Sequence, residues 1–333
     1  MTITIRDVAR EAGVSTATVS RALRGLGNVD PVTREHIRRV ADRLDYVISP
    51  TASRLAGGRT GAVAVISPHI SKWYFATALA GVERVMRESD IDLLVHTVGD
   101  APHPQPTLAE RRMRSRVDGV LVLGTLGDSA DVSALMERMF PLALVGTRRD
   151  GVSSVAIDDV EGARMGTQHL VNLGHRRIGL IGGRPGNAPF QPEEDRRAGF
   201  TEVLEAAGLC VDLRLQVPGN FTTAGGEDAM NTLLAQSAPP TAVFALSDEM
   251  AYGAMRALRR HGMRAGHDLA LVGFDGHDMA DLMELTTVSQ PVEDLGEQGA
   301  RNLLSVLADP DGVGVERTLP TTLQVRASSA PPR

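Results

Sequence analysis

The segment from residue 15 to residue 21 carries small polar side chains of the kind that contact the edges of DNA bases. At helical spacing, its outward face consists of Thr16, Ala17, Ser20 and Arg21. Hydroxyl and methyl groups at the start of a helix allow a close approach to base edges, and an arginine one turn later can reach a guanine or a phosphate. The pattern favours DNA binding; the alternative is the exposed surface of an unrelated three-helix bundle.

A second set of residues could hold a small molecule by stacking. Aromatic residues make up only 3% of the chain, and five of them follow or end expected strands: Trp73, Tyr74, Phe75, Phe221 and Phe274. Flat aromatic faces stack on sugar rings and on nucleobases. Because three adjacent aromatic side chains cannot all face one core, at least one of residues 73–75 is expected to face a cleft. Core packing is the alternative, above all for Phe274.

The common catalytic motifs do not occur in the chain. Its single lysine, Lys72, lies outside any Gly-x-x-x-x-Gly-Lys sequence, and neither His-Glu-x-x-His nor Gly-x-Ser-x-Gly is present. A single cysteine, Cys210, excludes an internal disulfide and a multi-cysteine metal site. We therefore expect neither an enzyme nor a bound metal or cofactor.

The chain has 333 residues, enough for two or three domains, and its charge is divided unevenly. Residues 1–59 hold ten arginines against six acidic residues, a net charge of +4, whereas the remainder carries −10. This division indicates that the basic head meets a polyanion, with a merely solvated surface as the alternative. No apolar run reaches the roughly 18 residues of a membrane span, and no apolar signal sequence follows the first residues, so a cytoplasmic location is expected.

Helix caps define the first two elements of the head. Thr4 and Asp7 form a capping box that starts one helix, and Gly13 ends it where a positive φ is needed. Ser15 caps a second helix that runs to Leu23. The apolar residues that face inward are Val8, Ala9, Ala12, Val19 and Leu23.

A third helix follows, with Asp30 as its cap and Pro31 at its first position. Its inner stripe consists of Ile37, Val40 and Leu44. Two short helices joined by a glycine-containing turn and supported by a third predict a helix-turn-helix domain.

The run ITIRDVAREAGVSTATVSRAL, residues 3–23, resembles the head of the LacI/GalR family of bacterial transcription regulators. The resemblance places Thr33, Arg34 and Tyr46 among phosphate contacts, and Thr16 and Ala17 at the positions that set operator choice. Ala17 departs from members with a long polar side chain there and can offer only a methyl contact. The implied DNA contacts are Thr4, Ser15, Thr16, Ala17, Thr18, Ser20, Arg21, Asn28, Thr33, Tyr46, Ala52 and Leu55.

Residues 49–58 have the pattern of a very short helix, with Ser49 as cap, Pro50 at the start and two glycines at the end. Helices shorter than roughly 12 residues are marginal in water, so this one is expected to form only when something packs on it. A plain linker is the alternative. The family resemblance implies a hinge helix that folds on DNA, pairs with its dimer mate and inserts Leu55 into the minor groove.

Beyond the hinge, short apolar runs alternate with helical patterns, which predicts parallel sheets built from βαβ units. The first series of expected strands is Ala62–Ile66, Leu93–His96, Val120–Leu123 and Leu142–Val145. The second series is Ile178–Ile181, Leu215–Val217, Val243–Leu246 and Leu269–Phe274. Two series indicate two lobes, with chain crossings near Ile157–Asp158 and Thr287–Gln290. Helix Val292–Leu307 is expected to return to the first lobe, and Leu323–Val325 to the second.

The body also resembles that family, whose effector domain is similar to periplasmic sugar-binding proteins. The segments that carry this resemblance are residues 173–178, 247–253 and 272–275. It implies a small-molecule effector in a cleft at the carboxyl ends of the strands. Arg196 occupies the family's effector-binding arginine position, and Asp275 its acidic position. Together they could hydrogen-bond ligand hydroxyls; a salt bridge that closes the lobes is the alternative.

Two positions of the expected cleft depart from the family pattern. Ser247 stands for the usual asparagine, and Gly146 for an aspartate found in many members. Both changes are expected to enlarge the pocket and remove a polar contact, which would suit a bulkier ligand such as a disaccharide. The implied effector contacts are Trp73, Tyr74, Phe75, Arg196, Phe221, Ser247, Asp248, Phe274 and Asp275.

The sequence thus predicts an all-α helix-turn-helix headpiece with a hinge helix and a two-lobe α/β body. The expected parts are residues 1–46 (head), 47–59 (hinge), 60–157 with 288–320 (first lobe), and 158–287 with 321–333 (second lobe). We expect a homodimeric or tetrameric repressor that binds a near-palindromic operator under the control of a small molecule, expected to be a mono- or oligosaccharide. The alternatives are a purine- or nucleoside-responsive regulator of the same fold, or a solute-binding protein or enzyme.

Overall fold

The computed structural model describes residues 3–23, 29–46, 59–97, 116–124, 140–183 and 191–332. It contains a small helical unit at the N-terminus and a large α/β unit, and each is described by itself. In the described parts of the chain, no helix is both long and apolar enough to cross a membrane.

The head consists of helices α1 (Ile5–Ala12), α2 (Thr16–Leu23) and α3 (Pro31–Arg43). The expected capping box forms at α1, where Thr4 donates its backbone N–H and its hydroxyl to the Asp7 carboxylate at 3.0 and 2.7 Å. Gly13 ends α1 at φ 67°, and Asp30 caps α3 through the backbone N–H of Thr33 at 2.9 Å. The three predicted helices are therefore confirmed.

The head has a hydrophobic core of its own. Its buried members are Val8, Ala9, Ala12, Val19, Ala22, Ile37, Val40 and Ala41. Leu23, Leu44 and Tyr46 are half-buried and pack against this core. Because all three helices contribute to it, the core fixes the orientation of α2 and leaves the opposite face of α2 exposed.

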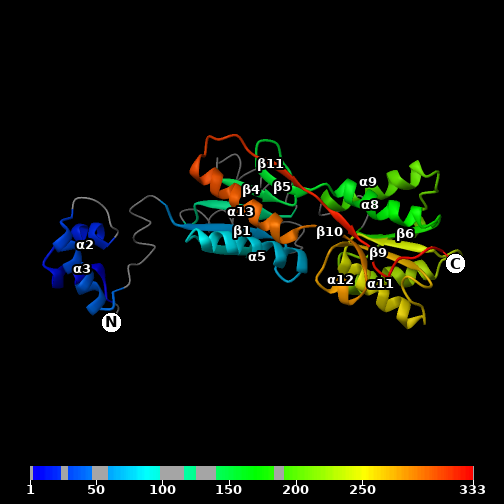
Figure 1. Cartoon of the computed structure of the whole chain (residues 1–333), viewed down its shortest axis with the longest axis horizontal. Helices are drawn as coiled ribbons and strands as arrows, with labels where there is room; N and C mark the ends of the chain where they lie inside the picture. The colour runs from blue at the N-terminus through cyan, green and yellow to red at the C-terminus, as the bar shows by residue number, and fades with distance from the viewer. Residues whose placement is uncertain are drawn as a thin grey trace. The chain divides into compact units, whose positions relative to one another are not determined.

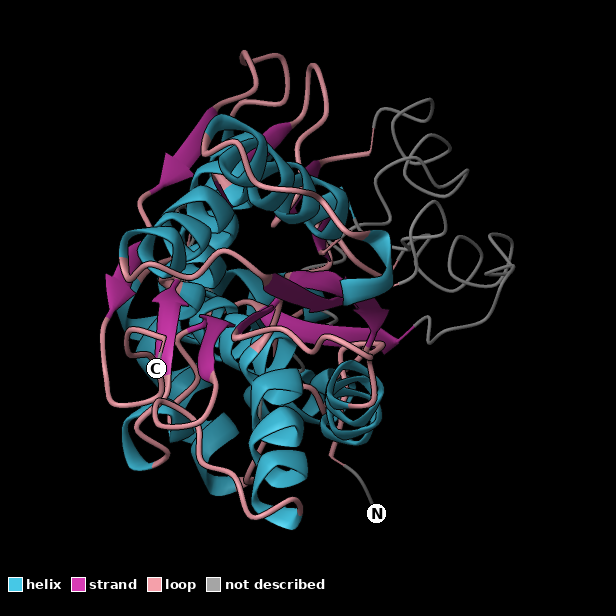
Figure 2. Cartoon of the chain, turned by 90° about the vertical axis from the view of Figure 1, so that its right-hand side faces the viewer, coloured by secondary structure: helices cyan, strands magenta, loops and turns pink. Residues whose placement is uncertain are grey.

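The body contains two six-stranded sheets, and helices pack against both of them (Figure 2). In the first sheet the order is β11 (Glu316–Leu319), β5 (Ser153–Ile157), β4 (Leu142–Val145), β3 (Gly119–Leu123), β1 (Ala62–Ser67), β2 (Asp92–Thr97). In the second it is β12 (Thr322–Gln324), β10 (Thr286–Ser289), β9 (Ala270–Asp275), β8 (Ala242–Ala245), β6 (Ile178–Gly182), β7 (Gln216–Pro218). The recorded strand pairs are parallel, except that β12 runs antiparallel to β10.

Helices α5 (Trp73–Glu88) and α13 (Val292–Ala308) pack on each other, and α13 covers β3, β4 and β5 of the first sheet. In the second lobe, α8 (Asp159–Asn172) and α9 (Gln191–Ala206) form one packed pair. Helices α10 (Thr223–Leu234) and α11 (Asp248–Arg260) form another. Figure 1 shows α8 and α9 on one side of β6 and β9 and α11 on the other, so helices cover both faces of the second sheet. In the part of the chain that the structure describes, the remaining short helices are η1 (Leu213–Leu215) and α12 (Met279–Leu282).

The chain passes between the lobes where the sequence placed its crossings. β5 ends at Ile157 and α8 begins the second lobe, whereas β10 ends at Ser289 and α13 returns to the first. As expected, β12 then joins the second sheet. Three strands, β5, β10 and β11, were not predicted from the sequence. Their serine, threonine and charged residues interrupt the apolar runs that indicated the other strands.

Candidate effector cavity and DNA-facing helix

A cavity of about 820 Å³, including the part that is open to solvent, lies between the carboxyl ends of the two sheets. Gly124, Gly146 and Ile157 line it from the ends of β3, β4 and β5. From the second lobe, residues that end or follow strands also reach the wall, among them Asp275 and Gln290. Ligands of open α/β sheets bind at this edge, so the cavity occupies the place that the fold dictates.

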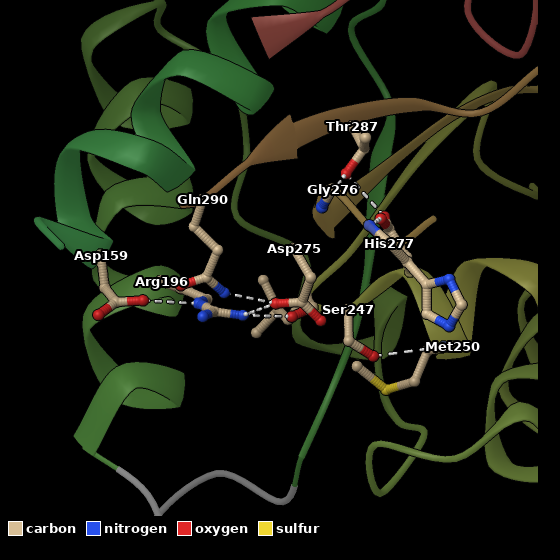
Figure 3. Close-up of polar contacts among 11 residues, drawn as sticks. Asp159, Arg196, Ser247, Met250, Asp275, Gly276, His277, Thr287 and Gln290 are labelled. Atoms are coloured by element: carbon tan, nitrogen blue, oxygen red, sulfur yellow. Dashed lines mark hydrogen bonds and ion pairs between the residues drawn. The ribbon is translucent and has the colours of Figure 1, made fainter. Parts of the chain in front are cut away.

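The second-lobe wall is built around Arg196 of α9, which is 7% exposed. Its Nε lies 2.8 Å from Asp159 Oδ1, and its Nη1 lies 3.4 Å from Asp275 Oδ1. Nη1 also donates to the carbonyl oxygen of Leu246 at 2.7 Å, and the guanidinium carbon lies 3.7 Å from the centre of the Phe274 ring. Figure 3 shows Arg196 between the two carboxylates. These contacts hold the guanidinium in one orientation at the cavity wall.

The carboxylates of this wall have unusual protonation equilibria. Burial raises the pKa of Asp275 to about 6, although the charge of Arg196 acts in the opposite direction. Burial also raises the pKa of Asp159, again against the effect of Arg196. The side-chain amide of Gln290 donates to Asp275 Oδ1 at 2.8 Å and thereby favours the ionised form. The cluster therefore presents both hydrogen-bond donors and acceptors to the cavity.

The first-lobe wall comes from the first turn of α5. Trp73 and Tyr74 are half-buried and Phe75 is buried, and all three line the cavity. Gly124 and Gly146 follow β3 and β4 with positive φ. Because they have no side chains, they leave space for these aromatic side chains. A Cβ at Gly124 would lie 2.9 Å from Phe75 Cε1, and one at Gly146 would lie 2.6 Å from the Tyr74 hydroxyl oxygen. This side of the cavity is therefore aromatic.

Trp73 connects the two lobes at the edge of the cavity. Its indole Nε1 donates to Asp278 Oδ2 at 3.1 Å, and its ring stacks on His277 with centroids 4.8 Å apart. Its backbone N–H also reaches Glu249 Oε1 at 3.4 Å. His277, Asp278 and Glu249 belong to the second lobe, so these contacts hold the lobes together in this conformation.

In the head, α2 presents an exposed face formed by Thr16, Ala17 and Arg21. Ser15 Oγ accepts the backbone N–H of Thr18 at 3.1 Å, which caps the start of this helix. An exposed helix start with small side chains, followed by an arginine, is suited to approach the major groove.

Comparison with known proteins identifies the family of this chain. Residues 4–49 match the model of bacterial regulatory proteins of the lacI family, and residues 167–329 match a periplasmic binding protein-like domain. The HTH-type transcriptional regulator CelR of Thermobifida fusca is 35% identical, over 98% of this chain and 98% of its own length. The chain belongs to the LacI family of bacterial transcriptional regulators. It is therefore a transcriptional regulator and not an enzyme.

Solved structures of LacI-family members show the same fold over the whole chain. A transcriptional regulator CelR–cellobiose complex is 34% identical, with a TM-score of 0.73 over 98% of this chain and 99% of that one. The lac repressor dimer bound to operator and the anti-inducer ONPF is 25% identical, with a TM-score of 0.89 over 99% and 100%. The predicted fold, a helix-turn-helix head and a two-lobe periplasmic-binding-protein-like body, is confirmed.

Most of the predicted effector residues meet at the cavity of this LacI-family chain: Trp73, Tyr74, Phe75, Arg196, Phe221, Ser247 and Asp275. Two others require correction. Phe274, the penultimate residue of β9, is fully buried and does not line the cavity, and its ring packs against the guanidinium of Arg196. Asp248 is also fully buried, and its carboxylate accepts hydrogen bonds from Thr287 Oγ1 at 2.7 Å and from the backbone of His277 at 2.8 Å.

One further expectation about the cavity, and the alternative given for Arg196, were wrong. Gly146 does not enlarge the pocket, because the Tyr74 hydroxyl fills the space of the missing side chain. The ion pairs of Arg196 do not close the lobes either, since Asp159 and Asp275 both belong to the second lobe. Ser247 lines the cavity and at the same time caps α11 through the backbone N–H of Met250 at 3.3 Å.

Several wall residues were not predicted from the sequence. Two of them could have been found by searching for polar residues just beyond the end of each strand, had these strands been recognised. Asp159 and Gln290 lie just beyond the ends of β5 and β10, the strands that the apolar pattern did not reveal. Glu193, which also lines the wall, lies one helical turn before Arg196 and Arg197 on α9. Among the described residues, Lys72 and Glu249 complete the charged residues of the wall.

The predicted DNA contacts of the head have different surroundings. Thr4 is engaged in the capping box of α1, and Thr33 donates its hydroxyl to Asp30 at 2.9 Å at the start of α3. Ser20 is half-buried, and Tyr46 packs against the core of the head. Asn28, Ala52 and Leu55 lie outside the described residues.

Trp73 should act as an internal reporter of the cavity. It is the only tryptophan of the chain, and it both lines the cavity and stacks on His277. We expect a ligand that enters the cavity to change its fluorescence emission, because the surroundings of the indole then change. The measurement is a fluorescence titration with sugars and with nucleosides, with Trp73→Phe as a control that should be silent. A compound that raises the melting temperature of the body but leaves the emission unchanged would contradict this placement.

Proposed function

We propose that this LacI-family regulator is a repressor that binds a near-palindromic operator as a homodimer in the cytoplasm and responds to a carbohydrate in the cavity. The observation that carries the effector assignment is the position of Arg196. It is held between two carboxylates on one wall, opposite the aromatic side chains of the other wall. The head provides the exposed face of α2 for the operator.

A carbohydrate suits this arrangement chemically. Guanidinium groups only donate hydrogen bonds, and carboxylates accept them, whereas a sugar hydroxyl does both. Arg196 is already paired with Asp159 and Asp275, so its charge is compensated and offers little to an anionic ligand. Aromatic faces across the cavity can stack on the apolar face of a sugar ring. The 34% identical CelR structure contains cellobiose, which supports a sugar, and a disaccharide in particular.

The proposed DNA contacts follow from the head. Its net charge of +4 attracts the phosphate backbone, and α2 would place Thr16, Ala17 and Arg21 against base edges. A dimer with two-fold symmetry reads two half-sites, which makes the operator near-palindromic. The lac repressor dimer on its operator, similar over 99% of this chain, supports this reading.

The proposed mechanism is a shift between populations of conformations. An effector that binds one arrangement of the lobes better than another favours that arrangement, and operator affinity changes with it. Contacts of Trp73 with His277 and Asp278 would differ between arrangements. We propose residues 1–46 as the head, 47–59 with Leu55 as the hinge, 60–157 with 288–320 as the first lobe, and 158–287 with 321–333 as the second.

A purine or nucleoside is the second candidate effector. Phe221 and Trp73 both line the cavity and could stack on a base, while Asp275 and Arg196 could bond to its edge. A free nucleobase would use the same polar cluster as a sugar. The two effector classes are therefore separated by experiment.

A thermal-shift screen of sugars and nucleosides on the full-length protein tests the proposal. A ligand at a hundred times its Kd stabilises the native state by about 2.7 kcal/mol, which raises the melting temperature by several degrees. We expect cellobiose or another carbohydrate to do so, and sorbitol at the same concentration, an open-chain polyol, to have no such effect. If only nucleosides raise the melting temperature, the carbohydrate assignment is wrong and the second candidate takes its place.

A further inference from the structure

We propose that Tyr74 and Gly146 form a coupled pair that sets which effectors the cavity accepts. In this pair, the phenol hydroxyl of Tyr74 takes the place of a side chain at position 146 and is the hydrogen-bonding group that α5 directs at a neutral, hydroxylated ligand. The inference rests on the proposed function, because it takes the cavity to be the effector site, and it names the residues that decide its selectivity.

The geometry shows why the two residues depend on each other. Gly146 follows β4 at φ 76°, where its backbone N–H donates to the carbonyl oxygen of Val155 at 2.8 Å. A Cβ at this position would lie 2.6 Å from the Tyr74 hydroxyl oxygen but 3.7 Å from Tyr74 Cζ. The first distance is too short for a non-bonded contact, and the second is an ordinary one. Apart from the strain of the positive φ, a Cβ at position 146 therefore conflicts with the hydroxyl group of Tyr74 and not with its ring.

Tyr74 belongs to the wall of the cavity. The residue lies in the first turn of α5, and its ring packs edge-on against Phe75 with centroids 5.2 Å apart. Tyr74 lines the cavity together with Arg196, Asp159 and Asp275. Burial raises the pKa of Tyr74, and the charge of Asp159 adds to the effect, so the phenol stays protonated at neutral pH. A ligand in the cavity would meet this hydroxyl on one side and the charged cluster on the other.

The pair has a chemical consequence for the ligand. A carboxylate at position 146 would add a negative charge and could only accept hydrogen bonds, whereas a neutral phenol both donates and accepts. The side chain of Tyr74 is thus uncharged and can donate to a ring or glycosidic oxygen, or accept from a hydroxyl. Two carboxylates, Asp159 and Asp275, flank the single guanidinium of Arg196, so the cluster disfavours an anionic ligand, and we expect the cavity to accept a neutral ligand rich in oxygen atoms.

The packing contact between Tyr74 and position 146 can be tested without any ligand in four variants of the full-length protein. These variants are Gly146→Ala, Tyr74→Phe, the double variant, and Gly151→Ala. Gly151 is the matched control, because its φ of 77° equals that of Gly146 within a degree but its Cβ would meet nothing within 4 Å. Both alanine variants carry the strain of a positive φ. We expect Gly146→Ala to lower the melting temperature more than Gly151→Ala, and this excess to disappear in the Tyr74→Phe background.

The ligand part is tested by the affinity for cellobiose, measured by Trp73 fluorescence and by calorimetry. Tyr74→Phe removes one hydrogen bond and should weaken binding roughly three- to tenfold. Gly146→Ala should weaken it further in the wild-type background but have little additional effect in Tyr74→Phe. Gly151→Ala should bind cellobiose with the wild-type affinity, because Gly151 is not part of the cavity wall.

Several results would overturn the proposed coupling of Tyr74 and Gly146. Equal losses of melting temperature for Gly146→Ala and Gly151→Ala would show that Tyr74 and Gly146 are not coupled. Unchanged ligand affinity of Tyr74→Phe would show that the hydroxyl does not contact the effector. If nucleosides bind and sugars do not, the proposed carbohydrate effector fails, and the comparison is made with the nucleoside that binds. A protein that none of these compounds stabilises would refute the cavity as effector site and Tyr74 as its selectivity residue.

Discussion

Deletion of residues 1–59 is expected to abolish operator binding and to leave a folded body. Specific DNA binding is typically about 10³–10⁷ times tighter than non-specific binding, and this deletion removes the α2 face and the net charge of +4 that would supply both. The body should fold without the head because its hydrophobic core contains no residue of the head. Gel-shift titration on operator duplexes selected from random DNA by the full-length protein measures the loss.

The design of this truncation follows the structure. Thr60 is kept because its backbone N–H and hydroxyl donate to Asp118 at 2.6 and 2.9 Å, which anchors the chain before β1. The truncated body should respond to the effector as the full-length protein does, and we expect it to remain a dimer. Full-length Arg21→Ala serves as the mild control, with weaker operator binding but an unchanged body. Operator binding of undiminished affinity by the truncated body would refute the assignment of the head.

Substitution Arg196→Ala is expected to weaken effector binding about ten- to a hundredfold, which corresponds to the roughly 1.5–3 kcal/mol of a lost charged hydrogen bond. The affinity for operator in the absence of effector should stay unchanged, since Arg196 belongs to the body and not to the surface of α2. The variant leaves Asp159 and Asp275 without their cation, so the melting temperature should fall as well. Calorimetric titration well below the melting temperature measures the affinity.

Two further variants separate the role of Arg196 in binding from its role in stability. Arg196→Lys keeps the positive charge between the carboxylates but loses the planar contact with Phe274 and the forked geometry, so it should recover stability more than affinity. Arg164→Ala removes an arginine that pairs with Glu161 and Glu202 on the exposed surface, and it should change neither quantity appreciably. An Arg196→Ala protein that binds the effector as tightly as the wild type would place the effector elsewhere.

The head could be predicted almost completely because its signals are local. The capping box of Thr4 and Asp7, the positive φ of Gly13 and the cap at Asp30 all act within a few residues. Such short-range hydrogen bonds form in the same way whatever the rest of the chain does. The exposed residues of α2 then follow from the helical period, because one apolar stripe determines which face is turned inward.

The body was predictable in its outline and less so in its strands. Apolar runs revealed the strands that are buried on both faces, such as β1, β3 and β4, whose residues are all buried. The sequence Ser-Ser-Val-Ala-Ile of β5 is equally buried, but it begins with two polar residues, and β11 is largely exposed. Polar residues in a strand depend on partners from neighbouring strands, and the sequence does not identify those partners.

The sequence by itself determined the class of this protein, the helices of its head and the edge of the sheets where a ligand would lie. Only the tertiary structure decided which side chains form the wall there. Phe274 and Asp248 are fully buried, while Asp159 and Gln290 reach the cavity from just beyond the ends of β5 and β10, which the apolar pattern did not reveal. The coupling of Tyr74 with Gly146 joins residues 72 positions apart through a single hydroxyl oxygen. Contacts of this kind depend on how helices and sheets pack against each other, and side-chain packing is not encoded in local periodicity.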